Sequence, residues 1–458
     1  MEKPNLKVII IGGSIAGLTL AHCLEVAGID YTVLEKHRDI LVTIGGSVGL
    51  LPNGSRILEQ LGVYERLETV GCPVKIAHST YPDGFVFSDD WPETIWKRKV
   101  PLATYIWQLI QALYDTLKDP SRVRTGQRVA RIETRAHGVS VFIETGKEYQ
   151  GDVVVGADGV HSVTRSQMWQ AAELSLPGIV SEKERHILCS EYSCVLGLSS
   201  PVKGLNPGEQ VIACHDNTAI LLFPGKDREI GWGLVQKLDK RSTSSEPHRF
   251  SHDEVLAKGQ AAAELRLYRD IKFKDIWAKT TKYSSTTLEE GLLGTWHYGR
   301  IVCVGDSVSK MTPNLAQGAN TAIEGAAALA NVLQQISVLR EPSEHEISRL
   351  LQSYAERQKR RLRRVHAVSY SATRLHTRRN WIWKLWGRYV YPNTPNAILH
   401  TLGGIITQAP FLSYVPLPKR AFNPVSKIFR PVNFMNSLAS GFPGISLSKN
   451  QCSARPFR

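Results

Sequence analysis

The chain begins with a segment typical of a nucleotide-binding β–α–β unit. A β-branched run, Val8–Ile11, is followed by a glycine-rich turn at 12–17 (GGSIAG), an amphipathic helix and a second strand at Tyr31–Leu34. Gly12 allows the tight turn, the free N–H groups of the helix N-terminus bind a pyrophosphate, and Gly17 lets helix and strand pack closely. The segment therefore predicts a parallel sheet with a dinucleotide at its edge.

Three further residues complete this fingerprint. Glu35 ends the second strand, where a carboxylate can accept hydrogen bonds from ribose hydroxyls. Gly13 and Ser14 form the middle of the turn, and Ser14 stands where the GxGxxG pattern has its second glycine. A serine narrows the approach of the backbone to a phosphate, although its hydroxyl can itself bond one. The alternative for Glu35 is a surface residue at the end of a strand.

A second motif follows the apolar strand expected at Tyr149–Val155. It reads GADGVHSVTR at 156–165, with Asp158 between two glycines and Arg165 six residues after the second glycine. The side chain of Asp158 can anchor the turn by bonding to the turn's backbone, and the glycines allow a cofactor to approach closely. Arg165 offers a cation near a phosphate or a carboxylate. A generic strand–turn–helix is the alternative.

A third motif lies almost three hundred residues after the first. The strand expected at Arg300–Gly305 ends at Asp306, and a helix rich in small residues begins at 317–320 (QGAN). Gly318 and Ala319 would let this helix press against a flavin, and its dipole would stabilise the negative charge of the reduced ring. Together with the N-terminal fingerprint, this motif predicts FAD held by both ends of the chain. A purely structural helix is the alternative.

Composition limits which partners other than FAD the chain is expected to bind. The chain of 458 residues has a net charge of +14, and its cations concentrate at 357–364 (RQKRRLRR) and 376–381 (HTRRNW), both inside an expected helix. We interpret these runs as a solvated helix face and not as a nucleic-acid site, because no aromatic-interleaved or zinc module accompanies them. The seven cysteines form no CxxC pair, so no metal site is predicted and a reducing compartment is favoured.

The segment Trp381–Pro418 is rich in aromatic and aliphatic residues with interspersed cations. A helical cap docked on the protein is favoured, and association with a membrane interface is the alternative. No window of eighteen apolar residues predicts a spanning helix, and the N-terminus shows no leader. We therefore expect a cytoplasmic protein, with association with the cytosolic face of an internal membrane left open.

The three motifs together resemble those of the single-component FAD-dependent aromatic-hydroxylase superfamily. The similarity is closer to fungal monooxygenases that epoxidise prenyl chains in indole-diterpene and meroterpenoid biosynthesis, and it extends to 45–65, 81–85, 357–375 and 414–420. It implies an α/β fold in which a Rossmann-like FAD-binding domain of the glutathione-reductase type is interleaved with a mixed β-sheet substrate domain, followed by a helical C-terminal region. The implied segments are 1–75, 101–170 and 291–375 for FAD, 76–100 and 171–290 for the substrate domain, and 376–458 for the C-terminal cap.

The resemblance also implies site residues and a reaction. Glu35 would bind the adenosine ribose, and Gly49, Asp306 and Ala319 would be further FAD contacts. NAD(P)H would reduce the FAD during a brief visit, which fits the absence of a second nucleotide fingerprint. O2 would then form a flavin C4a-hydroperoxide that epoxidises or hydroxylates a prenylated, lipophilic substrate. Two positions depart from the pattern: Ile106 stands where relatives usually carry an Arg that contacts the cofactor, and Ser193 stands where many have Arg.

A catalytic base is the least defined element. Tyr192 and His215 lie on expected strands of the substrate domain, where either could face the flavin or simply pack in the core. Alkene epoxidation needs no base, whereas hydroxylation of a phenol gains from one. An epoxidase or hydroxylase of a prenylated substrate is the first hypothesis. An aromatic-ring hydroxylase is the second, and a degenerate FAD-binding protein, oxidase-like or non-catalytic, is the third. The sequence gives no prediction of oligomeric state.

Overall fold

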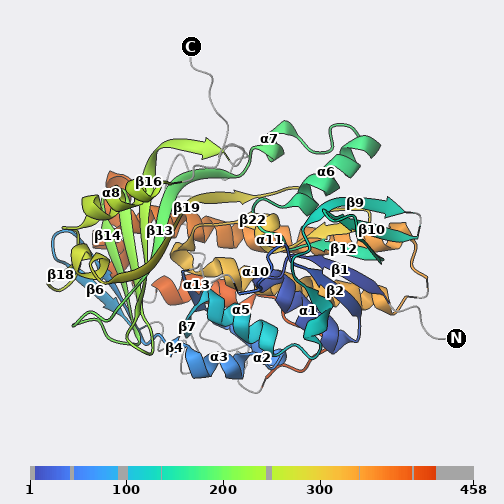
Figure 1. The fold of residues 1–458 in the computed structure, drawn as a ribbon. Helices are drawn as coiled ribbons and strands as arrows, with labels where there is room; N and C mark the ends of the chain where they lie inside the picture. Colours follow the sequence, from blue (N-terminus) through green and yellow to red (C-terminus); the bar gives the residue numbers. More distant parts are fainter. Residues whose placement is uncertain are drawn as a thin grey trace, which may run out of the picture.

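The computed structural model describes residues 6–41, 46–90, 102–135, 137–243, 250–339, 341–394 and 397–418. It has two parts, one built on a parallel sheet and the other on a large, mostly antiparallel sheet (Figure 1). A single long helix, α11 (Glu344–His376), contacts both parts. The predicted α/β fold is confirmed.

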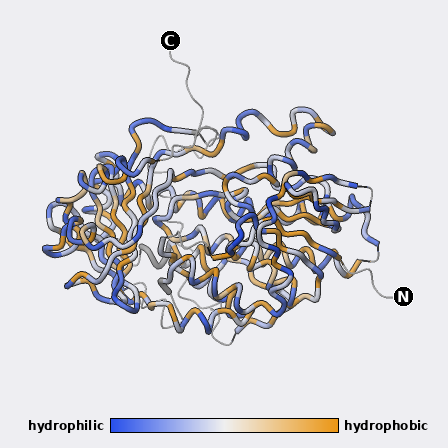
Figure 2. The backbone as a smooth tube through the Cα atoms, in the orientation of Figure 1, coloured by the Kyte–Doolittle hydropathy of each residue, from blue (hydrophilic) through white to orange (hydrophobic). Residues whose placement is uncertain are grey.

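The parallel sheet carries the nucleotide fingerprint. Its strand order is β20-β21-β12-β1-β2-β8, and β20 alone among these strands runs antiparallel to its neighbour. The strands are β1 (Lys7–Ile11), β2 (Asp30–Leu34), β8 (Val123–Arg124), β12 (Val153–Gly156), β20 (His297–Tyr298) and β21 (Ile301–Cys303). The central strands are almost wholly aliphatic (Figure 2), as expected for a parallel sheet covered on both faces.

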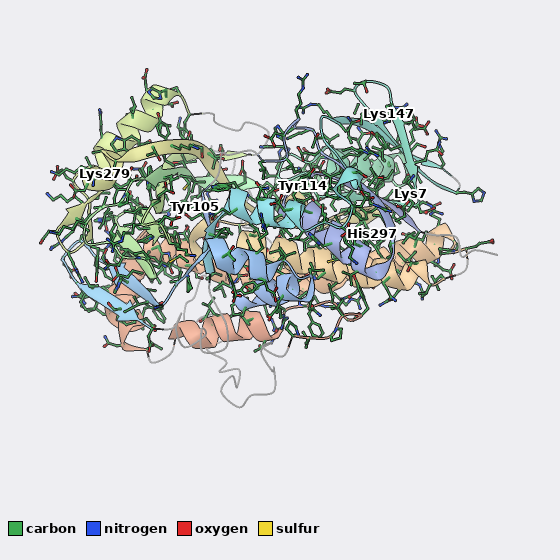
Figure 3. The ribbon with its side chains drawn as sticks, turned by 60° about the horizontal axis from the view of Figure 1, so that its bottom comes forward. Lys7, Tyr105, Tyr114, Lys147, Lys279 and His297 are labelled. Carbon is green, nitrogen blue, oxygen red and sulfur yellow. The ribbon has the colours of Figure 1, made fainter. Side chains whose placement is uncertain are left out.

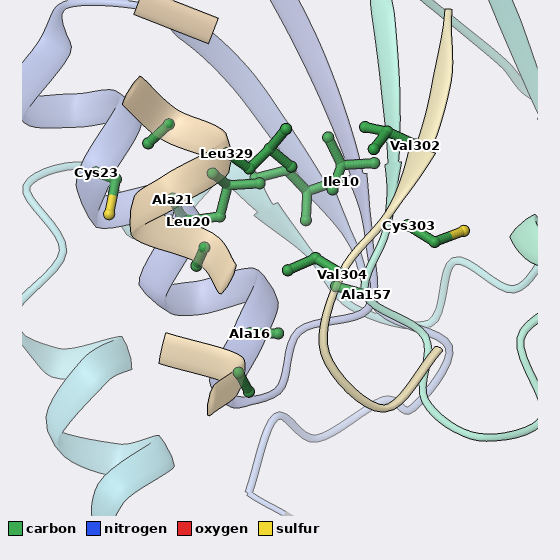
Figure 4. Packing of buried hydrophobic residues seen from close by; sticks show 14 of the residues in the cluster. Ile10, Ala16, Leu20, Ala21, Cys23, Ala157, Val302, Cys303, Val304 and Leu329 are labelled. Carbon is green, nitrogen blue, oxygen red and sulfur yellow. The ribbon is translucent and has the colours of Figure 1, made fainter. Parts of the chain in front are cut away.

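Two different layers cover this sheet. Helices α1 (Ile15–Ala27) and α10 (Gln317–Ser337) pack on one face (Figure 1). Figure 4 shows Leu20 and Leu329 from this layer packed beside Ile10 and Val302 of the sheet. The other face is covered by α6 and a three-stranded antiparallel sheet. These elements are α6 (Val163–Ser175), β9 (Val129–Arg135), β10 (Gly138–Ile143) and β11 (Glu148–Gly151).

One expected strand is divided in two. The strand predicted at Tyr149–Val155 is broken at Asp152, so that β11 belongs to the antiparallel sheet and β12 to the parallel one. Asp152 is bonded twice to Lys7, once from its backbone N–H to the Lys7 carbonyl at 2.8 Å and once from the Lys7 N–H to its carboxylate at 2.8 Å. The chain therefore changes sheet at this residue, a break that the prediction of one continuous strand did not include.

The large sheet has the strand order β22-β19-β13-β16-β15-β14-β5-β6. Its strands are β5 (Ile76–Thr80), β6 (Val86–Asp89), β13 (Cys189–Ser199), β14 (Glu209–His215), β15 (Thr218–Pro224), β16 (Ile230–Thr243), β19 (Thr280–Leu292) and β22 (Ser309–Lys310). Helices α8 (His252–Ala262) and α9 (Phe273–Trp277) lie on its outer face, where the rings of Trp232 and Phe273 meet edge to face with centroids 5.3 Å apart. The inner face is turned toward α11.

A small sheet joins the two parts. It is formed by β3 (Ser47–Leu50), β7 (Leu102–Tyr105) and β4 (Cys72–Pro73), and it is flanked by α2 (Pro52–Gln60), α3 (Tyr64–Val70) and α5 (Ile106–Asp115). Tyr105, labelled in Figure 3, lies where β7 meets the large sheet. Its hydroxyl fits closely against Gly225, because a Cβ placed on that glycine would lie only 3.1 Å from it.

The C-terminal region begins earlier than predicted from the run of basic residues at 376–381. The helix expected through residue 381 ends at His376, because Arg378 adopts a left-handed backbone with φ of 45°, and α12 (Trp381–Leu385) starts anew. Helix α13 (Ala397–Thr407) follows, and a tail then runs over α2. Gln60 anchors this tail, since its side-chain amide donates to the carbonyls of Leu412 and Val415 at 2.9 and 2.8 Å. The remainder of the predicted cap, 419–458, lies outside the described residues.

A buried ion network fastens α11 to the large sheet. Arg374 donates to Glu191 of β13 at 2.6 Å and to both carboxylate oxygens of Glu290 of β19 at 2.8 Å. Burial alone would raise the pKa of Glu191, but Arg374 and Arg379 outweigh it and hold that pKa at about 2. Cations of this region thus pair with buried carboxylates. Arg361 also departs from the expected solvated face, since its side chain is 9% exposed and pairs with the fully buried Glu324.

Substituting Arg374 with Met should therefore destabilise the protein strongly. The change leaves the carboxylate of Glu290 without its bidentate partner, and that of Glu191 without the nearer of its arginines, at a cost of about 3–5 kcal/mol. We expect a clear drop in the midpoint of urea unfolding. Arg66→Met removes the exposed Arg66–Asp115 pair and should cost about 1 kcal/mol or less. Equal effects of the two variants would contradict the structural role assigned to Arg374.

Candidate cofactor site

The three motifs meet at the carboxyl end of the parallel sheet. Ile11 is in register with Gly156, and Gly156 with Cys303, so the turns that follow the three strands lie side by side. The first turn is very close to the second: a Cβ on Gly12, whose φ is 108°, would lie 2.4 Å from the carbonyl oxygen of Ala157. A Cβ on Gly17 would lie 1.9 Å from the carbonyl of Gly12. Both positions therefore require glycine.

The acidic residue at the end of β2 is fixed beside this turn. Glu35 is 8% exposed, and its two carboxylate oxygens accept hydrogen bonds from the backbone N–H groups of Gly13, at 2.7 Å, and His37, at 2.9 Å. Ser14 is exposed at the N-cap of α1, and its hydroxyl makes no bond to the helix. The N-terminus of α1 thus has a free hydroxyl and uncapped N–H groups, as an anion site needs.

The middle motif serves to hold the turns together. Asp158 accepts hydrogen bonds from the hydroxyl of Ser162 at 2.6 Å and from the N–H and hydroxyl of Thr164 at 3.0 Å, which fixes the start of α6. Arg165 was expected to offer a cation to a ligand. Its guanidinium instead donates to the carbonyl of Ser307 at 2.7 Å and to that of Val160 at 2.9 Å. Arg165 therefore ties the second motif to the third.

The third motif begins with a short 3-10 turn, η2 (Gly305–Ser307), so β21 is shorter than predicted. Gly305 has φ of 71° and packs on the first turn of α1, since a Cβ there would lie 3.1 Å from that of Ala16. Asp306 follows with its side chain 35% exposed and forms an ion pair with Lys310. The carboxylate expected at this edge is therefore present and already has a cation beside it.

The start of α10 is brought against β3. Asn320 accepts a hydrogen bond from the N–H of Leu51 at 2.9 Å and donates to the carbonyl of Gly49 at 2.8 Å. A Cβ on Gly49 would approach that of Ala316 to 3.1 Å, whereas one on Gly318 would meet nothing within 4 Å. Ala319 is partly buried beside this open position. Gly49, Gly318 and Ala319 thus lie together. A flat ring packed against the start of α10 would require small residues at these positions.

Helix α11 supplies a set of contacts that the motifs did not reveal. Its polar face holds the loop between Asp306 and α10 through four residues spaced three, four and three apart: His366, Ser369, Thr373 and His376. The Nε2 atom of His366 lies 2.9 Å from the hydroxyl of Ser309. Thr312 is bonded to the hydroxyls of Ser369 and Thr373 at 3.4 and 2.5 Å, and Asn314 to His376 at 3.3 Å.

The two candidate catalytic residues lie on opposite faces of the large sheet. Tyr192 is fully buried on the inner face, beneath the guanidinium of Arg374 and hydrogen-bonded from the hydroxyl of Thr377 at 3.3 Å. A ring nitrogen of His215 lies 2.8 Å from the carbonyl of Arg266, in the packing of the outer face. The structure therefore does not bring these two side chains together.

The two departures from the family pattern also have definite positions. Ser193 faces α8, where its hydroxyl accepts a hydrogen bond from Lys258 at 3.1 Å, so it lies away from the inner face. Ile106 begins α5 and packs against the core of the parallel-sheet part, with its N–H bonded to the carbonyl of Gly46 at 3.2 Å. The apolar Ile106 side chain contributes no charge to the site.

The geometry fits FAD. The site has an uncapped helix N-terminus, a fixed carboxylate where a ribose would lie and an open glycine at the start of α10. Two buried polar atoms at that helix start have no partner among the described residues, namely Oδ1 of Asn314 and Nε2 of Gln317. Residues 5–369 match the FAD binding domain family. The chain belongs to this family of flavoproteins. Its cofactor is FAD.

Comparison with curated proteins places the chain among the monooxygenases of that family. It is 55% identical to the FAD-dependent monooxygenase sdgC of Emericella nidulans over 441 residues, covering 91% of this chain and 90% of that one. It is 42% identical to the FAD-dependent monooxygenase olcE of Penicillium canescens, covering 92% of each. The protein is an FAD-dependent monooxygenase, as the resemblance predicted.

The solved structures agree with the fold. HpxO of Klebsiella pneumoniae, in complex with FAD and uric acid, superposes with a TM-score of 0.74 over 89% of this chain and 98% of that one, at 21% identity. A salicylate hydroxylase substrate complex superposes with a TM-score of 0.64 over 83% and 91%, at 20% identity. At these identities the similarity concerns the fold alone.

The histidines on the polar face of α11 predict a specific pH dependence. Burial lowers the pKa of His366 and His376 to about 4, whereas unfolding returns each to about 6.5. Between these values the unfolded chain takes up protons that the folded protein does not, so stability is full above about pH 6.5 and falls toward pH 4. The melting temperature should fall with pH across this window.

The double variant His366→Gln and His376→Gln should have a shallower dependence of melting temperature on pH between about 4.5 and 6.5, although other buried histidines keep part of the slope. The control is His186→Gln, because His186 is exposed and pairs with Glu182. If the double variant keeps the full slope of the wild-type protein, the two histidines do not hold the loop in their neutral form.

Proposed function

We propose that this monooxygenase uses NAD(P)H and O2 to epoxidise a prenylated, lipophilic intermediate of fungal terpenoid or meroterpenoid biosynthesis. The observation that carries the proposal is the apolar cluster on the inner face of the large sheet, whose buried members include no histidine or carboxylate. The carboxylates of Glu191 and Glu290 beside it are both engaged by Arg374. The similarity to FAD-dependent monooxygenases of Emericella and Penicillium supports the reaction class.

Four groups of residues would hold the cofactor. Glu35 would bind the adenosine ribose, and the turn of Gly12, Gly13, Ser14 and Gly17 would bind the pyrophosphate. Asp306 would bind the ribityl chain, and Gly318 and Ala319, with Gly49 opposite, would border the flavin ring. When bound, FAD supplies hydride acceptance and oxygen activation, while the protein supplies position and a dry environment.

The inner face of the large sheet would form the wall of the substrate site. Its buried residues are Tyr81, Tyr192, Cys194, Ile212, Cys214, Ala219, Leu221, Val235 and Leu288, with Leu196 and Phe223 partly buried beside them. Leu196 lies against Gly46, just before β3, where a Cβ would approach it to 2.9 Å. A wall of this kind binds a prenyl chain through the hydrophobic effect and excludes water from it.

Proton transfer on this face is unfavourable. Burial raises the pKa of Tyr192, and it raises those of Cys194 and Cys214 to about 12. Hydroxylation of a phenol gains from a base that forms the phenolate, whereas oxygen addition to an isolated alkene needs none. The inner face therefore favours epoxidation over ring hydroxylation.

Tyr192→Phe tests this proposal. The variant loses a hydroxyl that accepts one long hydrogen bond, so we expect kcat with a prenylated substrate within about threefold of wild type, with an unchanged pH profile, because no proton passes through the hydroxyl. The product mass should increase by one oxygen, located by fragmentation on the alkene. A fall of about a hundredfold or more in kcat, or oxygen found on an aromatic ring, would favour the ring-hydroxylase alternative.

A second proposal concerns the place of the reaction: the enzyme binds peripherally to an internal membrane from its cytoplasmic side. None of the helices in the described ranges is long and apolar enough to span a bilayer. Helix α12 and the π-helical segment η4 (Trp386–Val390) that continues it nevertheless expose Trp381, Leu385 and Tyr389 at 70%, 50% and 59%. An apolar stripe on a protein of net charge +14 suits an anionic interface.

Sedimentation with phosphatidylcholine–phosphatidylserine vesicles measures this binding. The variant with Ser at 381, 385 and 389 should remain in the supernatant under conditions where the wild-type protein sediments, because it loses the apolar area that enters the interface. Leu174 and Leu176 are also exposed, at 81% and 59%, but lie on α6 and just after it. Serine at these two positions should leave sedimentation unchanged, and wild-type protein that does not sediment would refute the proposal.

A further inference from the structure

A small cavity lies where the small sheet meets the hairpin of β15 and β16. Ser47 of β3 and Tyr105 of β7 line it from one side, and Phe223 and Gly225 of the hairpin line it from the other. Its volume is about 20 Å³, which accommodates a group the size of a water molecule or a hydroxyl. None of its described lining residues belongs to the three cofactor motifs.

Two hydroxyls at this cavity lack a hydrogen-bond partner. The Oγ atom of Ser47 and the Oη atom of Tyr105 are both buried, and neither bonds to any described residue. The two residues are in register across β3 and β7, so their side chains lie on the same face of the small sheet. A buried hydroxyl without a partner is unfavourable. A ligand that supplies the missing bonds would account for the pair.

Close packing against the hairpin keeps the two hydroxyls in place. A Cβ on Gly231 of β16 would lie 1.8 Å from the Oγ of Ser47 and 3.2 Å from the ring of Tyr105, and one on Gly225 would lie 3.1 Å from the Oη of Tyr105. The N–H of Tyr105 donates to the side chain of Gln108 at 3.1 Å, which fixes the start of α5. Glycines at 225 and 231 thus leave the space that the two hydroxyls occupy.

The same face of the small sheet leads to the proposed position of the flavin. Gly49 lies two residues after Ser47 on β3, so it is on the same face and about 7 Å away. A Cβ on Gly49 would lie 3.1 Å from that of Ala316, at the start of α10. Phe223 borders the cavity and also packs on the apolar cluster of the inner face. The hydroxyl pair therefore lies between the start of α10 and the apolar wall.

The charges at the cavity favour a neutral ligand group. Its described lining residues include two carboxylates, Asp227 and Glu229, and one cation, Lys226, whose ammonium donates to a backbone carbonyl of α3 at 2.9 Å. An anionic group would be repelled by the two carboxylates. Burial raises the pKa of Tyr105, so its hydroxyl keeps its proton and can donate. A hydroxyl or carbonyl oxygen is a suitable acceptor.

We propose that Ser47 and Tyr105 are substrate-binding residues that hold a neutral oxygen, a hydroxyl or a carbonyl, of a substrate whose prenyl chain lies along the apolar wall. This inference rests on the prenylated substrate proposed above and adds the chemical class of its polar end. It predicts that the two hydroxyls distinguish prenyl compounds that differ only in that oxygen.

Binding to the FAD-loaded enzyme tests this role without turnover. The two probes are farnesol and the hydrocarbon that has a hydrogen atom in place of its hydroxyl, and quenching of protein fluorescence gives the Kd of each. The quantity compared is the Kd of the hydrocarbon divided by that of farnesol, because the different solubilities of the probes then cancel between wild type and variant. This ratio should fall at least about fivefold in the double variant Ser47→Ala and Tyr105→Phe, since farnesol alone loses hydrogen bonds.

Tyr114→Phe is the matched control. It removes a hydroxyl from the same helix, α5, where Tyr114 packs on the core of the parallel-sheet part (Figure 3), and it should leave the ratio unchanged. If both probes bind but the ratio of the double variant stays within about twofold of wild type, the role of the two hydroxyls is refuted and the apolar wall stands. If neither probe binds to the wild-type enzyme, the wall is refuted as well, and the epoxidation proposal with it.

A third probe tests the charge of the bound group. Farnesoic acid carries a carboxylate in place of the alcohol of farnesol. Asp227 and Glu229 would repel it, so its Kd for the wild-type enzyme should be higher than that of farnesol. A lower Kd would overturn the assignment of a neutral oxygen.

The melting temperature tests the premise that the two hydroxyls are free. Because neither bonds to a described residue, Ser47→Ala and Tyr105→Phe remove no hydrogen bond, and each variant should melt at the wild-type temperature or above it. A fall of several degrees in either variant would show that its hydroxyl is bonded within the protein, and would overturn the proposal.

Discussion

The register of three parallel strands is the constraint on which the rest of the structure depends. Because β1, β12 and β21 are aligned so that Ile11, Gly156 and Cys303 stand in one row, turns from the two ends and the middle of the chain leave the sheet at one point. The turns approach so closely that Gly12 and Gly17 have no space for a side chain. One ligand can therefore be held by segments almost three hundred residues apart.

Helix α11 sets the second constraint, because it fixes both sides of the site with one rigid element. Its polar face bonds the loop before α10 through His366 and Thr373, and His376 continues the same face toward the end of the helix. Arg374 binds the large sheet through Glu191 from an adjacent position. Helix α11 thus binds the flavin-side loop and the substrate-side sheet from one rigid element, and the pairing of β22 with β19 adds a second connection between them.

The sequence predicted the cofactor half well because glycine spacing and strand ends are local properties. The first β–α–β unit, the turn at Asp158 and the helix starting at Gln317 all occur where the motifs placed them. Contacts that depend on tertiary packing were not predictable. The guanidinium of Arg165 binds backbone carbonyls, and the cation at Arg361 pairs with a buried carboxylate. The sequence of a basic run is the same whether its cations are solvated by water or paired with buried carboxylates.

The large sheet, which we propose forms the substrate site, was harder to predict from the sequence. Its inner face is shaped by alternation along β13, β14 and β15, which places Tyr192 inside and His215 outside although both were reasonable candidates from the sequence. A cofactor that activates oxygen itself needs orientation and dryness from the protein more than it needs an acid or a base. On the proposed function, selectivity would come from the shape of an apolar wall. Residues such as Leu196 and Phe223, partly buried on that wall, are therefore the ones we propose to set substrate preference.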